Sequence, residues 1–544
     1  QIIEKIFTEL GFTDYQLSLT GSYQPCAYCV QYRESSFNFV SRLMEQEGIF
    51  YFFDHQRDKH ILILGDSPSA YLPCKGKATV RFHRGEVVEE DDTITEWHEA
   101  RELRAGRVAL KDFNFETPKT DLTVNQDSLI QVGGNPSFEI YDSFGEYHKR
   151  GEGDRYANLR MEEEESHHAL VQGEGVHRGF SPGFTFTLDK HPVPAFNRRY
   201  VLASVMHSGG NNYLTPDGGS SYSNSFTNMP DDAHYRPTRL TPKPVVQGPQ
   251  TAIVVGPKGE EIHTDKYGRV KVQFYWDREG HYNEKSSCWV RVSQNWAGRR
   301  WGAMFLPRIG QEVIISYLEG DPDHPIITGR VYNADEMPPY SLPGEQTKST
   351  LKSYSSKGGG GFNELRFEDQ KGQEQVFLHA ERQQDNRVKE DSLEWVGQDR
   401  HLIVKQNQLE EVGGTQNLTV KGAKNEEVQG KFSLKADQDL HQKVGMNLAT
   451  EAGMNIHIKA GMNLVIESQV MLTLKVGGNF IALSPANIAI QGTMVLINSG
   501  GSPGEGAGAQ PDAPQSPKEA DDAQPGGASS LPPDPTPPLR KPFG

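Results

Sequence analysis

The run Gly320-Asp-Pro-Asp-His-Pro325 places two carboxylates and a histidine within four positions. Asp321, Asp323 and His324 could supply a general acid, a general base and the group that orients them. The same run has the composition of a turn and lies between two predicted strands. We therefore expect a turn here rather than a catalytic site.

Cys26 and Cys29 form the one C-x-x-C spacing in a chain with four cysteines. A structural zinc site needs four ligands, and neither Cys74 nor Cys288 completes a second pair. No His-x-x-x-His follows at a fitting distance. We predict ordinary buried thiols and a reducing, cytoplasmic origin.

Two further clusters could hold ligands. Glu162–Glu165 lie beside His167 and His168, a set that could bind a metal ion. A charge run on a helix, here predicted at Arg155–Val171, is typical of a solvated face. The glycine-rich run Lys357–Asn363 lacks the residue order of a phosphate-binding loop and predicts a flexible connection. The sequence thus predicts no catalytic, cofactor-binding or metal site, and no enzyme.

Composition narrows the function further. The chain has 544 residues with 55 glycines and 33 prolines, which is too long for one core and predicts several domains. A net charge of −16 argues against a nucleic-acid partner, because phosphate binding needs a basic face. No run of about 18 apolar residues exists, so no stable membrane insertion is expected.

Residues 388–499 carry two superimposed periods. Every eighth position from Val388 to Val428 is valine, and the register continues through Val444 to Val476, often with glycine next in the chain. From Phe432 to Val476, apolar residues mostly occupy even positions and polar residues mostly odd ones, which is typical of strands with one buried face. Glycine reaches positive φ without a steric penalty and predicts a bend between short strands.

One octad is too short to form a whole coil of a single-chain β-helix. Other copies must supply the remaining sides, and the simplest closed solution is a trimer in which three chains form an intertwined triple-stranded β-helix. The alternative is an ordinary antiparallel meander, which would need turn signals such as Asn-Gly or Asp-Gly. The predicted trimer core consists of Val444, Leu448, Ile456, Ile458, Leu464, Ile466, Leu472, Leu474 and Val476.

The preceding segments predict two further domains. Residues 1–240 mix short helices, at Ile2–Leu10 and from Ser35 or Ser36 to Gly48, with strands at Ile49–Phe53 and His60–Leu64. A proline-rich boundary follows, and residues 246–335 then predict a small five-stranded barrel of the OB type. Its predicted strands are Val270–Trp276, Cys288–Ser293, Ala303–Leu306, Val313–Leu318 and Ile326–Tyr332.

Several long motifs resemble one family. Gln31-Tyr-Arg-Glu-Ser-Ser-Phe-Asn-Phe39 with Glu47–Phe53 resembles the hub of the VgrG proteins, the valine-glycine repeat spikes of type VI secretion. The resemblance continues along most of the chain, in family order. Its other motifs are Asp265–Val272, Trp289–Ser293 with Gly302–Gly310, Gly320–Pro325 and Asn363–Asp369.

The resemblance implies a trimeric α+β and mostly β spike with a phage-hub-like base, an OB barrel and a triple-stranded β-helix. It implies a tube of Hcp hexamers at the base, a PAAR-repeat protein at the tip, and effector or adaptor cargo. It also implies export by type VI secretion from the bacterial cytoplasm, without a signal peptide. The family's first hub strands are expected before Gln1. A tail spike of a contractile phage and a spike that carries an enzymatic effector remain alternatives.

The resulting division is a base at 1–240, a barrel at 246–335, a connector at 336–387, octads at 388–499 and a disordered tail at 500–544. At the end of the octads the alternation stops, and both even and odd positions are apolar: Met494, Val495, Leu496 and Ile497. Because an open strand end needs cover, we predict that a separate cap binds these four residues. The tail is rich in Pro, Gly, Ala, Ser and Asp and predicts no core. Folding of the tail over Val495 and Ile497 is the alternative.

Overall fold

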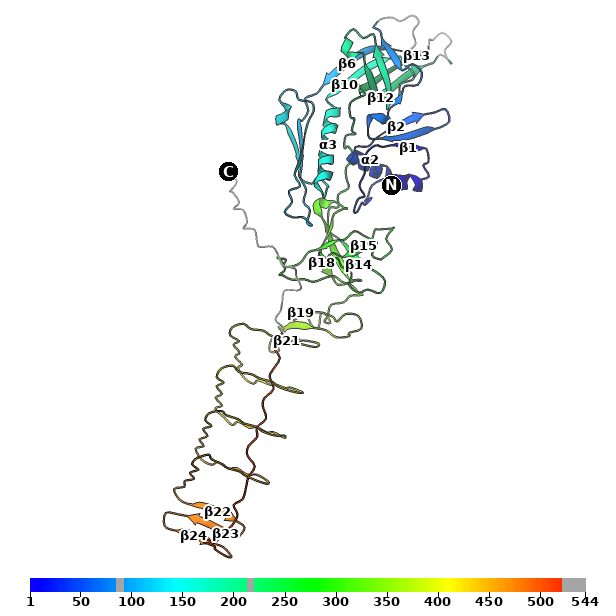
Figure 1. Ribbon diagram of the computed structural model, residues 1–544. Coiled ribbons are helices and arrows are strands. Elements are labelled where there is room, and N and C mark those ends of the chain that lie inside the picture. Colours follow the sequence, from blue (N-terminus) through cyan, green and yellow to red (C-terminus); the bar gives the residue numbers. More distant parts are fainter. Residues whose placement is uncertain (85–91, 212, 214–219, 521–544) are drawn as a thin grey trace. The chain divides into compact units, whose positions relative to one another are not determined.

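The computed structural model describes residues 1–84, 92–211, 213 and 220–520. The chain separates into two units, Gln1–Glu381 and Arg382–Gly544 (Figure 1). Strands dominate the first unit, whereas the described residues of the second contain three short strands, and the predicted mostly β, multidomain class is confirmed. None of the described helices is both long and apolar enough to cross a membrane.

The first unit opens with two helices on a small sheet. Helix α2 (Ser36–Glu47) buries Val40 and Met44 against this sheet, and helix α1 (Ile2–Glu9) packs on the same cluster through partly buried side chains. Of the two predicted starts of α2, Ser35 caps the helix, since it accepts a hydrogen bond from the Asn38 N–H at 3.1 Å. The sheet has the order β1-β3-β2, with β1 at Tyr15–Ser18, β2 at Phe50–His55 and β3 at His60–Gly65.

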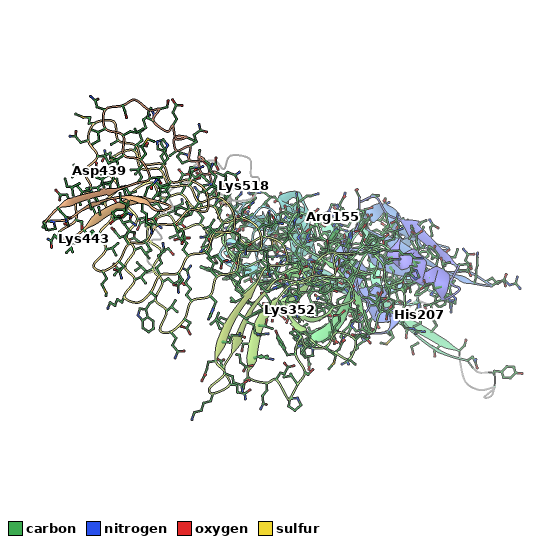
Figure 2. All side chains as sticks on the ribbon, turned by 90° about the horizontal axis from the view of Figure 1, so that it is seen from below. Arg155, His207, Lys352, Asp439, Lys443 and Lys518 are labelled. Atoms are coloured by element: carbon green, nitrogen blue, oxygen red, sulfur yellow. The ribbon has the colours of Figure 1, made fainter. Side chains whose placement is uncertain are left out.

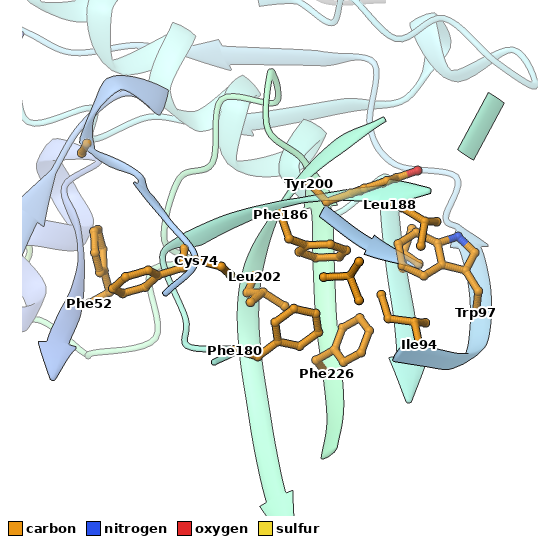
Figure 3. Packing of buried hydrophobic residues seen from close by; sticks show 14 of the residues in the cluster. Phe52, Cys74, Ile94, Trp97, Phe180, Phe186, Leu188, Tyr200, Leu202 and Phe226 are labelled. Atoms are coloured by element: carbon orange, nitrogen blue, oxygen red, sulfur yellow. The ribbon is translucent and has the colours of Figure 1, made fainter. Parts of the chain in front are cut away.

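A closed β-barrel forms the largest core. The pairing order is β12-β13-β10-β6-β5-β11, and β11 pairs back to the start of β12, which closes the barrel. The strands are β5 (Thr79–Phe82), β6 (Thr93–Arg101), β10 (Ala169–Gly175), β11 (Phe184–Asp189), β12 (Arg199–Gly210) and β13 (Ser221–Pro230), with β4 (Leu72–Pro73) added on β11. Phe186 and Leu188 point inward with Phe180, Phe226 and Trp97 (Figure 3).

An arm packs beside this barrel. Strands β7 (Arg107–Leu110), β8 (Val124–Asp127) and β9 (Glu139–Asp142) form a sheet, and helix α3 (Arg150–Ser166) covers it through Ala157 and Met161. The helix predicted at Arg155–Val171 is wrong at both ends. Residues 169–171 belong to β10, because their side chains follow the period-two pattern of that strand.

The second domain of the first unit has five strands in the order β15-β14-β17-β18-β16. A bridge between Val270 and Val290 returns from the last strand to the first, as a small barrel requires. The strands are β14 (Gln250–Val255), β15 (Lys271–Phe274), β16 (Arg291–Val292), β17 (Glu312–Tyr317) and β18 (Pro325–Val331).

The five-stranded prediction is confirmed, but one of its strands is wrong. Residues 303–306 are not a strand, because Trp296–Gly302 turns back on itself through a bridge and a positive φ at Arg300. Strand β14, which follows the proline-rich boundary, takes the missing place. A three-stranded sheet of β19 (Lys348–Lys352), β20 (Glu364–Glu368) and β21 (Gln375–His379) ends the unit.

The second unit contains the octads, one small sheet and the start of the tail. The sheet is an antiparallel meander of β22 (Leu472–Val476), β23 (Asn479–Leu483) and β24 (Ile488–Gln491). The chain then reverses direction, since Asn498, Gly500 and Gly501 all have positive φ. Residues 500–520 run back beside the octads (Figure 1). The predicted disordered tail otherwise falls on residues 521–544, which lie outside the described part.

Candidate functional site

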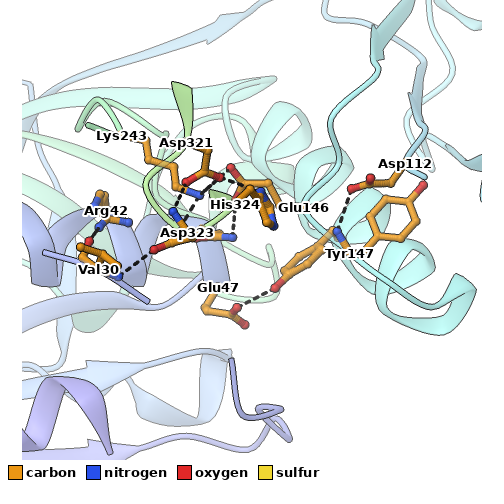
Figure 4. Close-up of polar contacts among 12 residues, drawn as sticks. Val30, Arg42, Glu47, Asp112, Glu146, Tyr147, Lys243, Asp321, Asp323 and His324 are labelled. Carbon is orange, nitrogen blue, oxygen red and sulfur yellow. Dashed lines mark hydrogen bonds and ion pairs between the residues drawn. The ribbon is translucent and has the colours of Figure 1, made fainter. Parts of the chain in front are cut away.

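The Asp321–His324 turn is an anchor between the N-terminal segment and the five-stranded domain (Figure 4). Lys243 Nζ lies 2.8 Å from Asp321, 3.5 Å from Asp323 and 3.0 Å from Glu146. His324 Nδ1 lies 3.1 Å from Asp321. The predicted turn is confirmed, because the His324 N–H donates to the Asp321 carbonyl at 3.0 Å.

The electrostatics of this anchor favour a fixed ion cluster. Burial opposes ionisation of Asp321, but the hydrogen bond from His324 and the charge of Lys243 outweigh it and hold its pKa below the ordinary range. The hydrogen bond to Asp321 in turn raises the pKa of His324. Burial raises the pKa of Asp323. These side chains bind one another, so their arrangement stabilises the turn.

The remaining candidate ligands also have structural roles. Among residues 1–84, 92–211, 213 and 220–520, no group of three or more His, Cys, Asp or Glu side chains could hold a metal ion. All four cysteines are free thiols. The expectation that Cys26 is buried is wrong, because its side chain is exposed, whereas Cys29 is half-buried and burial raises its pKa to about 12.

The charge run on α3 is not the predicted solvated face. Glu162 lies 2.6 Å from Arg236, and Glu163 lies 2.7 Å from Arg160 in a buried pair. Glu165 accepts hydrogen bonds from Ser128 and from the Leu129 N–H. The run therefore joins the arm to neighbouring segments, and these partners, distant in sequence, leave no local signal.

The octads present an apolar face that the described part of the chain does not cover. Leu464 is 57% exposed and Ile466 is 55% exposed. Large apolar side chains in the core of a folded protein are normally buried. Polar side chains such as Asp439 and Lys443 are exposed as well (Figure 2). The other predicted core residues are also exposed, except the half-buried Leu472: Val444, Leu448, Ile456, Ile458, Leu474 and Val476.

The octad backbone lacks partners too. Residues 388–470 form no strand or helix, and no backbone–backbone hydrogen bond joins them to any other residue in the described ranges. Native proteins pair nearly all such groups with protein or water. An extended, unpaired backbone with one apolar face is suited to association with further strands.

The last octads differ from the predicted continuous three-chain β-helix to residue 499. Residues 472–491 form an antiparallel meander, which is the alternative arrangement for this segment. Gly477 and Gly478 make a two-residue hairpin turn, with φ of +56° at Gly477, rather than the predicted bend between strands of a three-chain β-helix. The register still puts Leu472 and Leu474 on one face with Ile481 and Leu483, so the meander also has an apolar face.

The predicted tip residues lie between the meander and the chain reversal. Met494 is 73% exposed and Ile497 is 82% exposed, with Val495 and Leu496 between them also exposed. No strand contains them. Four consecutive exposed apolar side chains form a surface patch of the kind that marks contact sites.

Family comparisons match three segments. Residues 1–213 match the model of the phage tail baseplate hub, and residues 250–332 match that of the type VI secretion system and phage-baseplate injector OB domain. Residues 349–459 match the model of the bacteriophage T4 gp5 C-terminal trimerisation domain. The predicted hub-like base and OB fold are thereby confirmed.

Similar proteins include two from Pseudomonas aeruginosa. The type VI secretion system spike protein VgrG1b is 47% identical over 405 residues, which cover 73% of this chain and 54% of that protein. VgrG5 is 44% identical over 527 residues, which cover 94% of this chain and 66% of that protein. The actin cross-linking toxin VgrG1 of Vibrio cholerae is 37% identical over 408 residues, which cover 74% of this chain and 37% of that protein. The chain thus spans between about a third and two thirds of the length of these relatives.

Proposed function

Because this chain belongs to the VgrG family of type VI secretion spike proteins, we propose that it forms a homotrimeric spike that punctures a target envelope and delivers cargo. In this role the octads of three chains pair into one three-sided, triple-stranded β-helix, which we call the prism. The hub-like base, the barrel, the connector, the octads and the tail are then five successive parts with the boundaries predicted above.

One observation carries the proposal. Residues 388–470 leave both their backbone groups and their even-numbered apolar side chains without partners in the described part of the chain. Three copies satisfy both needs, because strands from neighbouring chains bond to the backbone while the apolar faces meet around a common axis. The match of residues 349–459 to a trimerisation domain supports the same number of chains.

The proposal extends to partners at the two ends. A tube of Hcp hexamers at the base follows from the family resemblance together with the match of residues 1–213 to a tail hub. A PAAR-repeat protein at the tip is supported by the exposed patch at Met494–Ile497. Secretion by the type VI system belongs to the same proposal.

We assign the chain a structural and delivery role rather than catalysis. The spike relatives in Pseudomonas aeruginosa support this assignment. The relative in Vibrio cholerae is described as a toxin, which keeps an effector-bearing spike as the second candidate. In either case residues 1–499 act as the carrier.

Native mass spectrometry of the full chain tests the proposal. A trimer that persists on dilution supports it. A stable monomer with unchanged solubility would overturn it, because the apolar row would then need no partner chain.

A further inference from the structure

The start of the tail contacts two octad residues and the last residue of the connector. His457 Nδ1 lies 2.5 Å from the carbonyl of Ala507. Lys431 Nζ lies 3.0 Å from Asp512 and 3.2 Å from the Gln510 carbonyl. The contacts continue toward the first octad, where Arg387 Nη1 donates to the carbonyl of Ala520 at 3.5 Å.

These contacts recur at the pitch of a three-sided prism. One turn of such a prism takes three octads, or 24 residues. His457 and Lys431 are 26 residues apart, and Lys431 and Arg387 are 44 apart, which are close to one and two turns. All three residues have odd numbers and so belong to the polar face. The tail therefore follows one outer side of the prism.

The lengths agree as well. Polyproline II chains rise about 3.1 Å per residue, so the five steps from Ala507 to Asp512 span about 15.5 Å. If each octad advances by one strand spacing of about 4.8 Å, the 26 residues between His457 and Lys431 advance by about 15.6 Å. The eight steps from Asp512 to Ala520 span about 25 Å, against about 26 Å for the 44 residues from Lys431 to Arg387.

This pitch leaves room for other chains beneath the tail. Each turn advances by three strand spacings along one side, and the tail's own chain supplies only one strand there. Two strand positions per turn remain, which is one for each of two further copies. The polyproline II form suits such a crossing because it has no internal hydrogen bonds and its backbone stays free to contact strands.

The composition of the tail fits this form. Pro511, Pro514 and Pro517 recur every third residue, the period of polyproline II. Gly506 lies against the ring of His457, and a Cβ at this glycine would come within 2.6 Å of the ring atom Cγ. A larger residue at this position would therefore displace the His457 side chain from its present place.

We propose that residues 507–520 form a strap that lies along one outer side of the prism and crosses strands of all three chains. The strap rests on the proposed trimer and adds to it: the tail is an interchain clamp, and Ala520 lies at the first octad rather than at the tip. This placement replaces the expectation of a tail that is free from residue 500.

A disulfide test addresses the contact itself. In a Cys26→Ser background, Lys431→Cys with Asp512→Cys is oxidised in the full chain, and the linked peptides are identified by mass spectrometry. The matched control is Lys443→Cys with Asp512→Cys, because Lys443 is also an odd-numbered lysine but lies half a turn away. We expect the 431–512 link within one chain to form several times faster than the control, since proximity raises the effective concentration. Equal rates would overturn the strap.

A second measurement addresses the crossing of other chains. A chain that ends at Gly501 should remain a trimer by native mass but melt at a lower temperature than the full chain. An unchanged melting temperature would overturn the clamp, although the trimer would stand. A monomeric full chain that still forms the 431–512 link would overturn both the clamp and the proposed function, while leaving the contact within the chain.

Discussion

The backbone N–H of Val30 donates a hydrogen bond to the Asp323 carboxylate at 2.7 Å, across 293 positions of sequence. Asp323 belongs to the turn that also holds Asp321 and His324, and Lys243 lies between the two carboxylates. This compact ion cluster thus helps to attach the five-stranded domain to the N-terminal segment, and part of the stability of this attachment depends on charge.

The first prediction concerns pH. His324 faces Asp321, Lys243 and the ring of His148, and its pKa is raised in the folded protein. A raised histidine pKa contributes stability that is complete below the unfolded value of about 6.5 and is lost as pH rises through the folded value. The melting temperature of the first unit should therefore fall between about pH 6 and pH 8.

The effect is small, because the His324 side chain is 37% exposed and solvent screens such pairs to no more than about 1 kcal/mol. His324→Gln should flatten this part of the pH profile in a melting series. A profile identical to that of the parent would show that another group causes the dependence.

The second prediction compares a buried and an exposed ion pair. Arg42 lies 2.9 Å from Glu34, with side chains only 4% and 6% exposed. Arg42→Met should destabilise the first unit by about 3–5 kcal/mol, because it leaves a buried carboxylate unpaired. Lys5→Met removes the exposed pair with Glu279 and should change stability by less than about 1 kcal/mol. Chemical denaturation of both variants checks the difference, and similar losses would contradict it.

The third prediction tests the inward face of the octads. Leu464→Asp would place three like charges around the proposed axis, and removing the partner of even one buried charge costs about 3–5 kcal/mol. Trimer assembly should fail by native mass while the first unit still folds. Lys459→Asp, at an odd-numbered position on the polar face, is the control and should stay trimeric. A trimeric, equally heat-resistant Leu464→Asp variant would show that the parity assignment is wrong.

The fourth prediction concerns the tip. Leu496→Lys with Ile497→Lys should abolish binding of a PAAR-repeat protein in a pull-down, because both side chains are exposed apolar contacts. A chain that ends at Gly501 keeps these residues and should retain binding. Loss of binding on tail removal alone would show that the tail, rather than the patch at Met494–Ile497, binds the cap.

The octads are predictable from sequence because their signal is local and repeated. Alternation by two is present from Phe432 to Val476, so the apolar parity of Leu464 and Ile466 follows directly from the order of residues. Capping signals are equally local, and Ser35 and Gly48 end α2 where expected. The Gly477–Gly478 pair is ambiguous, since one dipeptide serves both a prism corner and a hairpin.

The ion cluster could not be predicted in the same way. Lys243 meets Asp321 across 78 positions, and neither residue carries a local pattern that names its partner. The same reason explains Glu162–Glu165, which resemble a solvated face because Arg236 and Ser128 lie far away in sequence. Strand β14 (Gln250–Val255) is missed because it directly follows the proline-rich boundary, whose composition indicates a linker rather than a strand.

The return of the tail beside the octads couples two lengths that are encoded in different parts of the chain. A spike lengthened or shortened by one turn changes by 24 residues and by about 14 Å, which corresponds to about five residues of polyproline II tail. Insertions of one or two octads would also rotate the crossing points to another side and misalign Lys431 with Asp512. Spike length in a protein of this design is therefore expected to vary in steps of three octads, with a matching change of about five residues in the tail.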